Sequence, residues 1–166
     1  MPAQPLKILF LCTGNSARSI LGEYLIRRIA PGRFDSYSAG AKPTGKINPL
    51  VLRVLQEHYK IDASDARSKS WTEYKDVVFD FVITVCDNAR ESCPIWPGQP
   101  IIAHWGCPDP AAFEGGEGEK LQKTWQVAVQ MQRRLDLFCS LPLEKMERLK
   151  LAHAVGDIGR GEQAYD

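Results

Sequence analysis

The chain has 166 residues, with 21 Lys and Arg against 20 Asp and Glu and a formal net charge of +1 at pH 7. This length predicts a single domain over 1–166, with a core over about 7–139 and a C-terminal helix and tail over 143–166. The balanced charge argues against a nucleic-acid partner. No apolar run is long enough for a membrane helix or a signal peptide, and the cysteine count of five is odd, so we expect a cytoplasmic protein without a secreted disulfide framework.

The first strong pattern is the apolar run at residues 8–11, which is too short for a helix and predicts a strand buried on both faces. A loop of small residues follows directly, and a helical pattern begins at residue 18. Such a loop turns successive backbone N–H groups toward one point, and the helix N-terminus adds partial positive charge. We therefore predict an oxyanion site formed by Thr13, Gly14, Asn15, Ser16, Ala17, Arg18 and Ser19.

Cys12 ends the strand, where its sulfur would face the bound anion as a thiolate nucleophile. The helix dipole supplies at most about 2 kcal/mol toward the charged form. Hydrogen bonds from the loop amides and from the Ser19 hydroxyl must therefore contribute. Arg18 can close the ring with a bidentate guanidinium fork. The alternative is a buried structural cysteine at a strand end.

The rest of the chain alternates strands and helices. We predict strands over 34–39, 79–86 and 99–105 and a helix that Asn48 caps. A long helix over 119–139 should pack through Leu121, Trp125, Ala128, Leu135 and Phe138. A shorter helix over 143–154 should pack through Leu143, Met146 and Leu149, ahead of a frayed polar tail over 156–166, and residues 1–5 should form a loose arm. This order predicts an α/β fold with a parallel sheet and helices on both faces.

Three chemically interesting segments follow strands of this predicted sheet. Cys12, Cys86 and the loop after Trp105 all stand at carboxyl ends, where α/β sheets bind their ligands. We therefore expect them at one edge of the sheet. Asp109 lies in that last loop between Pro108 and Pro110, and there it can act as a general acid for a leaving oxygen. The alternative is an ordinary turn aspartate.

Cys86 and Cys93 flank a short polar segment, and two cysteines near a nucleophilic cysteine suggest thiol–disulfide exchange. One alternative is a pair of unrelated cysteines. Another is a zinc site with His104 and Cys107, although no tight Cys-x2-Cys pair is present. Cys107 and Cys139 are expected to serve packing, and His104 shows no partner pattern.

The segments CTGNSARS and HWGCPDP resemble the low-molecular-weight tyrosine phosphatase superfamily, over about Lys7–Cys139. The resemblance implies a flavodoxin-like fold with a four-stranded parallel sheet. It also implies that Cys12 is the nucleophile, that Arg18 clamps the anion and that Asp109 is the general acid. Asn15 and Ser19 match positions that shape the loop and support the thiolate.

Within the superfamily the chain resembles the arsenate reductase branch, because Cys86 and Cys93 match its redox pair while Ala111 and Ala112 replace the usual aromatic residues. This implies reduction of arsenate to arsenite by a Cys12/Cys86/Cys93 relay, with thioredoxin or glutaredoxin as reductant and no organic cofactor or catalytic metal. The alternatives are a phosphatase that hydrolyses phosphomonoesters and a non-enzymatic oxyanion-binding module. Some relatives bind potassium near the loop, and here Asn15, Glu23 and Ser38 are the residues available for it.

Overall fold

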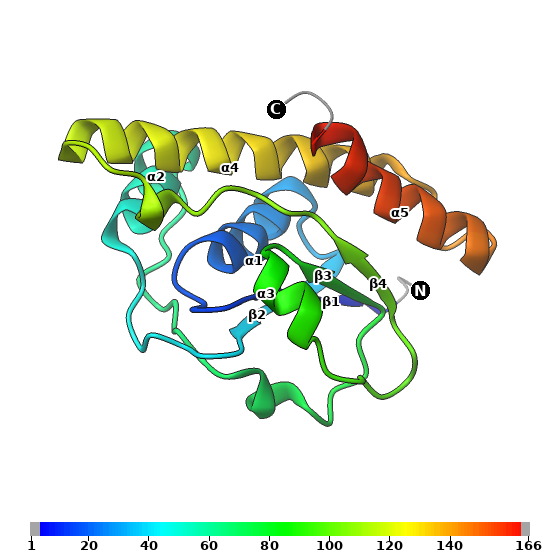
Figure 1. Ribbon diagram of the computed structural model, residues 1–166. Coiled ribbons are helices and arrows are strands. Elements are labelled where there is room, and N and C mark those ends of the chain that lie inside the picture. Colours follow the sequence, from blue (N-terminus) through cyan, green and yellow to red (C-terminus); the bar gives the residue numbers. More distant parts are fainter. Residues whose placement is uncertain (1–3, 164–166) are drawn as a thin grey trace.

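The computed structural model describes residues 4–163, so residues 1–3 of the predicted arm and residues 164–166 of the predicted tail lie outside it. Four parallel strands form one sheet in the order β2-β1-β3-β4 (Figure 1). They are β1 (Leu6–Cys12), β2 (Phe34–Gly40), β3 (Phe81–Thr84) and β4 (Ile101–His104). The sheet confirms the predicted α/β fold with flavodoxin-like strand order.

The register of the sheet brings the predicted site segments to one edge. Cys12 pairs with Gly40, Leu11 with Thr84, and Thr84 with His104. The carboxyl ends of the four strands therefore lie at one level across the sheet. The loops that carry Cys86 and Asp109 begin directly after this level, as the sequence predicts.

Strands β3 and β4 are shorter than the predicted ranges 79–86 and 99–105. Gln99 has a φ of 51°, so the extended conformation of β4 cannot begin there. At the other end of β3, Cys86 already serves as the N-cap of helix α3 (Asp87–Ser92). Turn and cap geometry therefore shorten runs whose composition alone favours strands.

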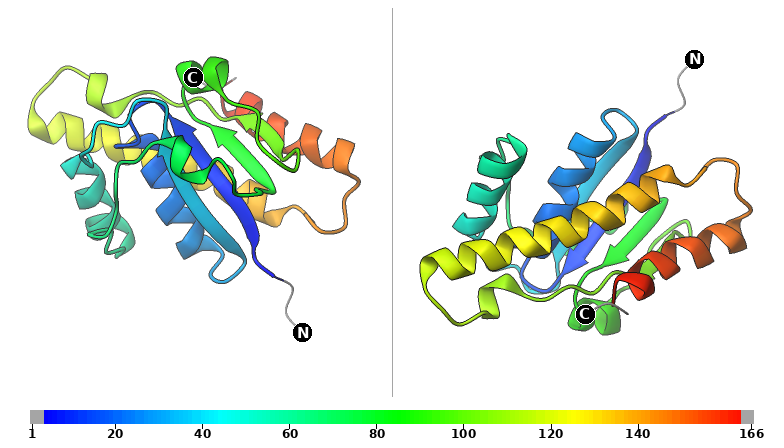
Figure 2. Two further views of the ribbon diagram at one scale, coloured as in Figure 1. Left: turned by 90° about the horizontal axis from the view of Figure 1, so that it is seen from below. Right: turned by 90° about the horizontal axis from the view of Figure 1, so that it is seen from above.

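Three long helices cover one face of the sheet: α1 (Arg18–Ile29), α4 (Glu117–Ser140) and α5 (Arg148–Gln163). In the right-hand view of Figure 2, α4 crosses over α1 and lies beside α5. Phe138 of α4 packs against Phe34 of β2 and Phe81 of β3, with ring centroids 5.6 and 5.0 Å apart. These contacts fix α4 across the centre of the sheet.

The opposite face is covered by the connection between α2 (Pro49–Tyr59) and β3, which includes the short 3-10 helix η1 (Trp71–Tyr74). The left-hand view of Figure 2 shows η1 in front of the strands. Tyr37 of β2 lies with its ring centroid 5.2 Å from those of both Tyr74 and Phe79. An aromatic cluster therefore takes the place of a long helix on this face.

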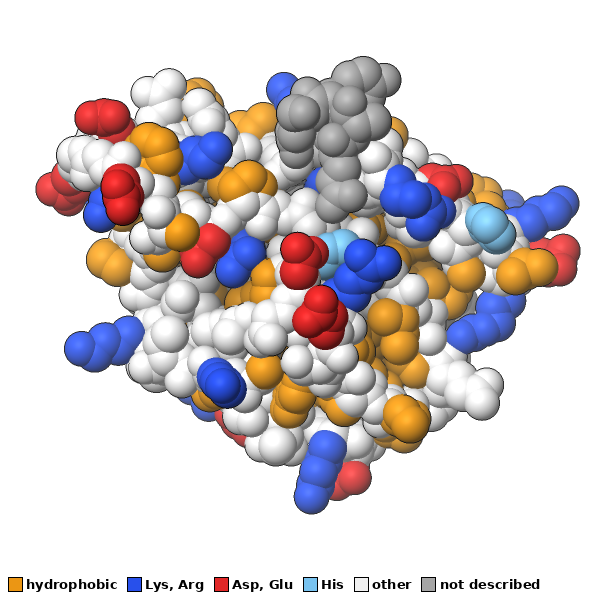
Figure 3. All heavy atoms as spheres, in the orientation of Figure 1, with side chains coloured by type: hydrophobic (Ala, Val, Ile, Leu, Met, Phe, Trp, Pro, Cys, Tyr) orange, Lys and Arg blue, Asp and Glu red, His pale blue; other side chains and the backbone are white. Residues whose placement is uncertain are grey.

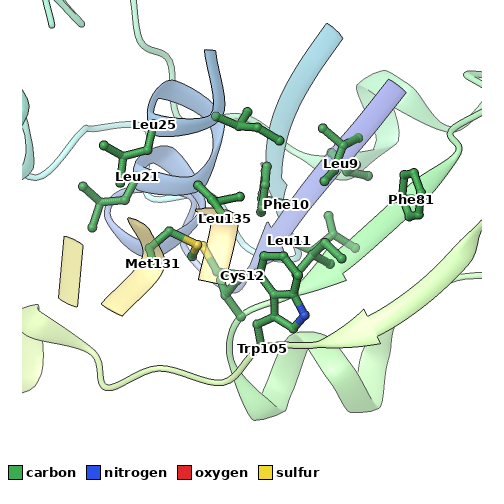
Figure 4. Close-up of a cluster of buried hydrophobic side chains, with 14 of the residues drawn as sticks. Leu9, Phe10, Leu11, Cys12, Leu21, Leu25, Phe81, Trp105, Met131 and Leu135 are labelled. Atoms are coloured by element: carbon green, nitrogen blue, oxygen red, sulfur yellow. The ribbon is translucent and has the colours of Figure 1, made fainter. Parts of the chain in front are cut away.

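The core is built around β1, where residues 8–11 are fully buried. Figure 4 shows Phe10 and Cys12 among side chains of α1 and α4, including Leu21, Leu25, Met131 and Leu135. Gly22 of α1 allows this close packing, because a Cβ atom there would stand 2.6 to 2.9 Å from the Phe10 ring. The nucleophile candidate therefore stands at the end of a fully buried row of the core.

Trp125 is not part of the packed face of α4, contrary to prediction. Its residue is 39% exposed, and its ring stacks on His58 of α2 with centroids 4.1 Å apart. The first half of α4 packs against α2 rather than the sheet, which moves the buried stripe by one position. That stripe consists of Thr124, Val127, Ala128, Met131, Arg134, Leu135 and Phe138.

The C-terminal segment also differs from prediction. Helix α5 begins at Arg148 rather than near Leu143 and continues through Gln163, where the sequence predicts a frayed tail. Leu149 is 67% exposed, whereas Leu151, Val155 and Ile158 are buried. The Trp105 indole donates a 2.9 Å hydrogen bond to the Val155 carbonyl, which docks α5 on β4. Tertiary packing therefore holds a glycine-rich helix that local propensity disfavours.

Residues 4–163 contain no helix that is both long enough and apolar enough to span a bilayer. On the face drawn in Figure 3, acidic and basic side chains lie interspersed, as the net charge of +1 leads one to expect.

Gly159→Ala should destabilise the protein by about 1–3 kcal/mol, because the new Cβ would overlap the His104 carbonyl oxygen and press α5 away from β4. Gly161→Ala is the matched control, since nothing lies within 4 Å of a Cβ at that position of the same helix. The control should stabilise by up to about 1 kcal/mol through helix propensity. Urea unfolding measures both, and equal stability of the two variants would show that α5 does not dock as described.

Candidate active site

The loop after β1 turns its carbonyl groups outward. The carbonyl oxygens of four loop residues accept hydrogen bonds of 2.8 to 3.2 Å from backbone N–H groups of the segment after β2. The pairs are Cys12 with Ala41, Thr13 with Lys42, Gly14 with Thr44, and Ser16 with Asn48. Because C=O and N–H point in opposite directions across a trans peptide, the N–H groups of residues 13, 14, 15 and 17 face the interior of the loop. The structure thus provides the ring of donors that an oxyanion needs.

Two further features make the loop suitable for an anion. Gly40 lies against it, and a Cβ at that position would stand 2.5 Å from the Thr13 carbonyl oxygen. Helix α1 starts at the end of the loop with Ala17 as its N-cap, no side-chain capping bond and no acidic residue in its first turn. Its first N–H groups and the positive end of its dipole therefore remain available to a ligand.

Cys12 is 3% exposed, and its sulfur lies within hydrogen-bond distance of two polar groups. The backbone N–H of Asn15 donates to Sγ at 3.1 Å, and the Ser19 Oγ lies 2.9 Å from Sγ. Ser19 Oγ also accepts a 2.8 Å hydrogen bond from Asn15 Nδ2. With one acceptor site of the hydroxyl engaged there, its proton is free to point at the sulfur when Cys12 attacks as a thiolate.

Arg18 and Asp109 meet above the loop. The Arg18 guanidinium donates to the Cys107 carbonyl oxygen at 3.2 Å and lies 3.7 Å from Asp109 Oδ2. Asp109 Oδ1 accepts from the Ala111 N–H at 3.0 Å, which caps the 3-10 helix η2 (Pro110–Ala112). The cap fixes one carboxyl oxygen and leaves the other directed toward the loop. The structure therefore brings the predicted clamp and the predicted acid together.

Cys86 lies at the rim of the same loop and is 7% exposed. Its sulfur is 3.2 Å from Thr13 Oγ1, which also accepts a 3.1 Å bond from Asn88 Nδ2. The sulfur further accepts the Ala89 N–H at 3.4 Å as the N-cap of α3. The Cys86 thiol therefore contacts the loop that surrounds Cys12 directly, through the Thr13 hydroxyl.

Cys93 is at the opposite end of α3, where it is the C-cap, and it does not lie beside Cys86. Seven residues of helical rise separate the two Cα atoms by roughly 10 Å, beyond the roughly 7 Å limit for a disulfide. Cys93 is half-buried, and burial raises the pKa of its thiol. In this conformation Cys93 is therefore a poor nucleophile.

The remaining cysteines are held as thiols. Burial raises the pKa of Cys107 to about 12, and its sulfur donates to the Val85 carbonyl at 3.7 Å. Burial also raises the pKa of Cys139 to about 11. Among the described residues no group of three or more His, Cys, Asp or Glu side chains is placed to hold a metal ion, so the zinc alternative gains no support.

Sequence reasoning weighed His104 only as a zinc ligand or a residue without a partner pattern, and it missed Lys69 altogether. His104 Nδ1 lies 2.8 Å from Thr84 Oγ1 and its Nε2 lies 3.1 Å from Asp87 Oδ1, so it ties β3 to the first turn of α3. Burial and nearby Arg90 lower its pKa. The position of His104 near the end of a predicted strand could have indicated that its side chain lies close to the site. Lys69 comes from an irregular polar segment without any such indication, yet its side chain is buried against Asn15.

Comparison with known proteins identifies relatives of this chain. The family model described as low molecular weight phosphotyrosine protein phosphatase matches residues 7–141. An arsenate reductase of Oceanobacillus iheyensis is 36% identical over 133 residues, which are 79% of this chain and 93% of that protein.

Two solved structures extend the comparison. The thioredoxin-dependent arsenate reductase of Corynebacterium glutamicum superposes with a TM-score of 0.59 and 29% identity, covering 82% of this chain and 65% of that one. An arsenate reductase in its phosphate-binding state gives a TM-score of 0.67 and 25% identity, covering 79% of this chain and 94% of that one. Together with the strand order and the loop geometry, these matches show that this chain belongs to the low molecular weight phosphotyrosine protein phosphatase family.

Proposed function

We propose that this protein is an arsenate reductase in which Cys12, Cys86 and Cys93 relay electrons from a dithiol protein. The observation that carries the proposal is the position of Cys86, whose sulfur lies 3.2 Å from Thr13 of the oxyanion loop. A phosphatase needs no second thiol at that position. The similarity to arsenate reductases over most of the chain supports the same reading.

The first step uses the loop and its acid. Arsenate is tetrahedral and anionic, so it fits the inward N–H groups of residues 13–17 and the forked guanidinium of Arg18. The Cys12 thiolate attacks arsenic and forms an S–As bond. The departing oxygen takes a proton from Asp109 and leaves as water or hydroxide.

The second step is the reduction itself. The Cys86 thiolate attacks Cys12 Sγ and forms a disulfide. The S–As bond breaks, and its electron pair stays on arsenic, which changes from As(V) to As(III) and leaves as arsenite. The Cys86 sulfur already contacts Thr13 Oγ1, on the residue next to Cys12, so its movement toward Cys12 starts from the loop itself.

The third step requires α3 to unwind, because Cys86 and Cys93 cap its opposite ends. Capture of the Cys86 sulfur in a disulfide removes the N-cap bond to Ala89, which loosens a helix of only six residues. Cys93 then leaves its half-buried position, ionises and attacks Cys86 Sγ. The Cys12 thiolate departs, and a Cys86–Cys93 disulfide remains.

The Cys86–Cys93 disulfide is then reduced by a dithiol protein. We propose thioredoxin as the reductant, with glutaredoxin as the alternative, because a solved relative is described as thioredoxin-dependent. Every step of the relay starts from a reduced thiol, so we also propose that the protein works in the cytoplasm. No step needs an organic cofactor or a metal ion.

Phosphomonoester hydrolysis is the second candidate function, since it needs only Cys12, Arg18 and Asp109, which the structure brings together. The two residues directly after Pro110 argue against phosphotyrosine as the preferred substrate. Ala111 and Ala112 are exposed and offer no aromatic surface to a phosphotyrosine ring. Assays of the same variants distinguish the two activities.

Cys86→Ser should lower arsenate turnover with thioredoxin by at least about a hundredfold, because serine cannot form a disulfide with Cys12. Hydrolysis of p-nitrophenyl phosphate should remain within about threefold of wild type, since the serine hydroxyl preserves the contact with Thr13. Cys139→Ser, on α4, is the control and should change neither rate. Unchanged arsenite production by Cys86→Ser would disprove the relay.

Cys93→Ser should release about one arsenite per enzyme and then stop, because the Cys12–Cys86 disulfide has no thiol to resolve it. Mass spectrometry of proteolytic fragments after a single addition of arsenate should find the peptides of Cys12 and Cys86 joined. Sustained turnover of this variant at the wild-type rate would show that Cys93 is not the resolving thiol.

Asp109→Asn should reduce hydrolysis of p-nitrophenyl phosphate by about 10²–10⁴-fold, because amides do not donate a proton to a leaving oxygen. The loss should shrink for aryl phosphates with more acidic phenols, which need less protonation. Asn retains a side-chain oxygen for the cap bond to Ala111, so η2 should stay in place. An equal loss for all leaving groups would assign Asp109 a structural role only.

A further inference from the structure

The Lys69 ammonium lies in a cage of oxygen atoms on the side of the loop away from Arg18. Its Nζ donates to the Arg67 carbonyl at 2.9 Å, to Ser38 Oγ at 3.2 Å and to Asn15 Oδ1 at 3.3 Å. Glu23 Oε1 stands 3.8 Å away and supplies the counter-charge. The side chain is only 6% exposed, so this cation is almost removed from solvent.

The cage uses the oxygen atoms that a potassium ion would need. The sequence resemblance points to Asn15, Glu23 and Ser38 as the candidate ligands, and all three face the Lys69 ammonium here. Hard cations need several oxygen ligands at once, and two cations cannot share one set at hydrogen-bond distance. The residues of this chain therefore do not fit a resident potassium ion.

A chain of hydrogen bonds connects the ammonium to the nucleophile. Lys69 Nζ and the Lys69 backbone N–H both donate to Asn15 Oδ1, which fixes the orientation of that amide. Asn15 Nδ2 then donates to Ser19 Oγ, and Ser19 Oγ lies 2.9 Å from Cys12 Sγ. A thiolate can only accept, so with Cys12 ionised every donor in the chain points toward the sulfur, and each bond polarises the next toward stabilising negative charge there.

The strained backbone of Asn15 makes this support necessary. Asn15 is fully buried with a φ of 47°, a conformation that costs energy for a residue other than glycine. Burial lowers the pKa of Lys69, and the Glu23 carboxylate opposes that shift. Arg27 and Ser38 in turn hold Glu23 at 2.7 and 2.5 Å. A charged network between α1, β2 and the segment before η1 thus converges on one loop amide.

We propose that Lys69 is a positioning residue that replaces a bound monovalent cation, because its ammonium orients Asn15 and, through Ser19, supports the Cys12 thiolate. The inference rests on Cys12 being the nucleophile of the proposed function. It does not depend on arsenate being the substrate, since a phosphatase would need the same thiolate.

The test is the rate at which iodoacetamide alkylates Cys12, followed between pH 5 and 9 by mass spectrometry of the Cys12 peptide. In Lys69→Ala the pH of half-maximal alkylation should rise by about one unit, with about a tenfold slower reaction below it. Ammonium or potassium ions should restore the rate with saturation, because they fit the vacated cage, whereas choline is too large. Lys75→Ala, an exposed lysine that caps η1, is the control and should behave as wild type.

Two results would overturn the proposal. One is a folded Lys69→Ala variant with the wild-type alkylation profile. The other is a slowed variant that no small cation restores, since the lysine would then act through packing alone. If Lys69→Ala does not fold, alkylation of the wild-type protein in different salts still tests the proposal. Its alkylation should be the same in potassium, sodium and choline chloride at equal ionic strength, and a specific increase in potassium would contradict the proposal.

This readout separates the inference from the proposed function. Absence of arsenate turnover in the wild-type protein would remove the reductase proposal but leave the alkylation profiles and their cation dependence intact. Conversely, normal alkylation of Lys69→Ala would remove the inference about Lys69 while arsenate turnover by wild type remained.

Discussion

The site depends on the outward rotation of the carbonyl groups in the loop between β1 and α1. Backbone donors from residues 41–48 hold these carbonyls, so the opposite N–H groups converge on one point. This requires β2 to run beside β1 in parallel and in register, with Gly40 opposite Cys12. It also requires glycine at that position, because a Cβ would collide with the Thr13 carbonyl. The oxyanion site is thus a product of sheet pairing rather than of the loop sequence alone.

Two networks meet at this loop and perform different tasks. The path from Lys69 through Asn15 and Ser19 reaches the sulfur of Cys12 and concerns its charge. The path from Thr13 to Cys86 reaches α3 and, in the proposed relay, concerns the supply of electrons. They approach from different elements and share no side chain. A substitution in one network can therefore alter nucleophilicity without altering electron relay, which makes the two roles separable in experiments.

The sequence predicted most of the fold and most of the site. Short apolar runs identified three of the strands, the range 34–39 was also correctly predicted as a strand, and the carboxyl-end rule placed Cys12, Cys86 and Asp109 at one edge of the sheet. The errors have a common cause. Trp125 and the α5 segment were misassigned because the stripe that a helix buries depends on its partner, and local periodicity does not identify that partner. Lys69 was missed because its role depends on contacts with residues 31 and 54 positions away in the sequence.

The geometry of α3 also sets the order of the proposed relay. While the helix is intact, Cys93 is half-buried with a raised pKa, and its Cα is too far from that of Cys86 for a disulfide. The thiol of Cys86, by contrast, already lies at the loop. Premature formation of Cys86–Cys93 would consume electrons without reducing a substrate. A helix whose N-cap is the reactive sulfur itself avoids this, because its stability falls only after Cys86 has reacted. The His104–Asp87 contact adds a second restraint on the same turn. The short length of α3 therefore suits the proposed function, since a longer helix would retain Cys93 after the first disulfide had formed.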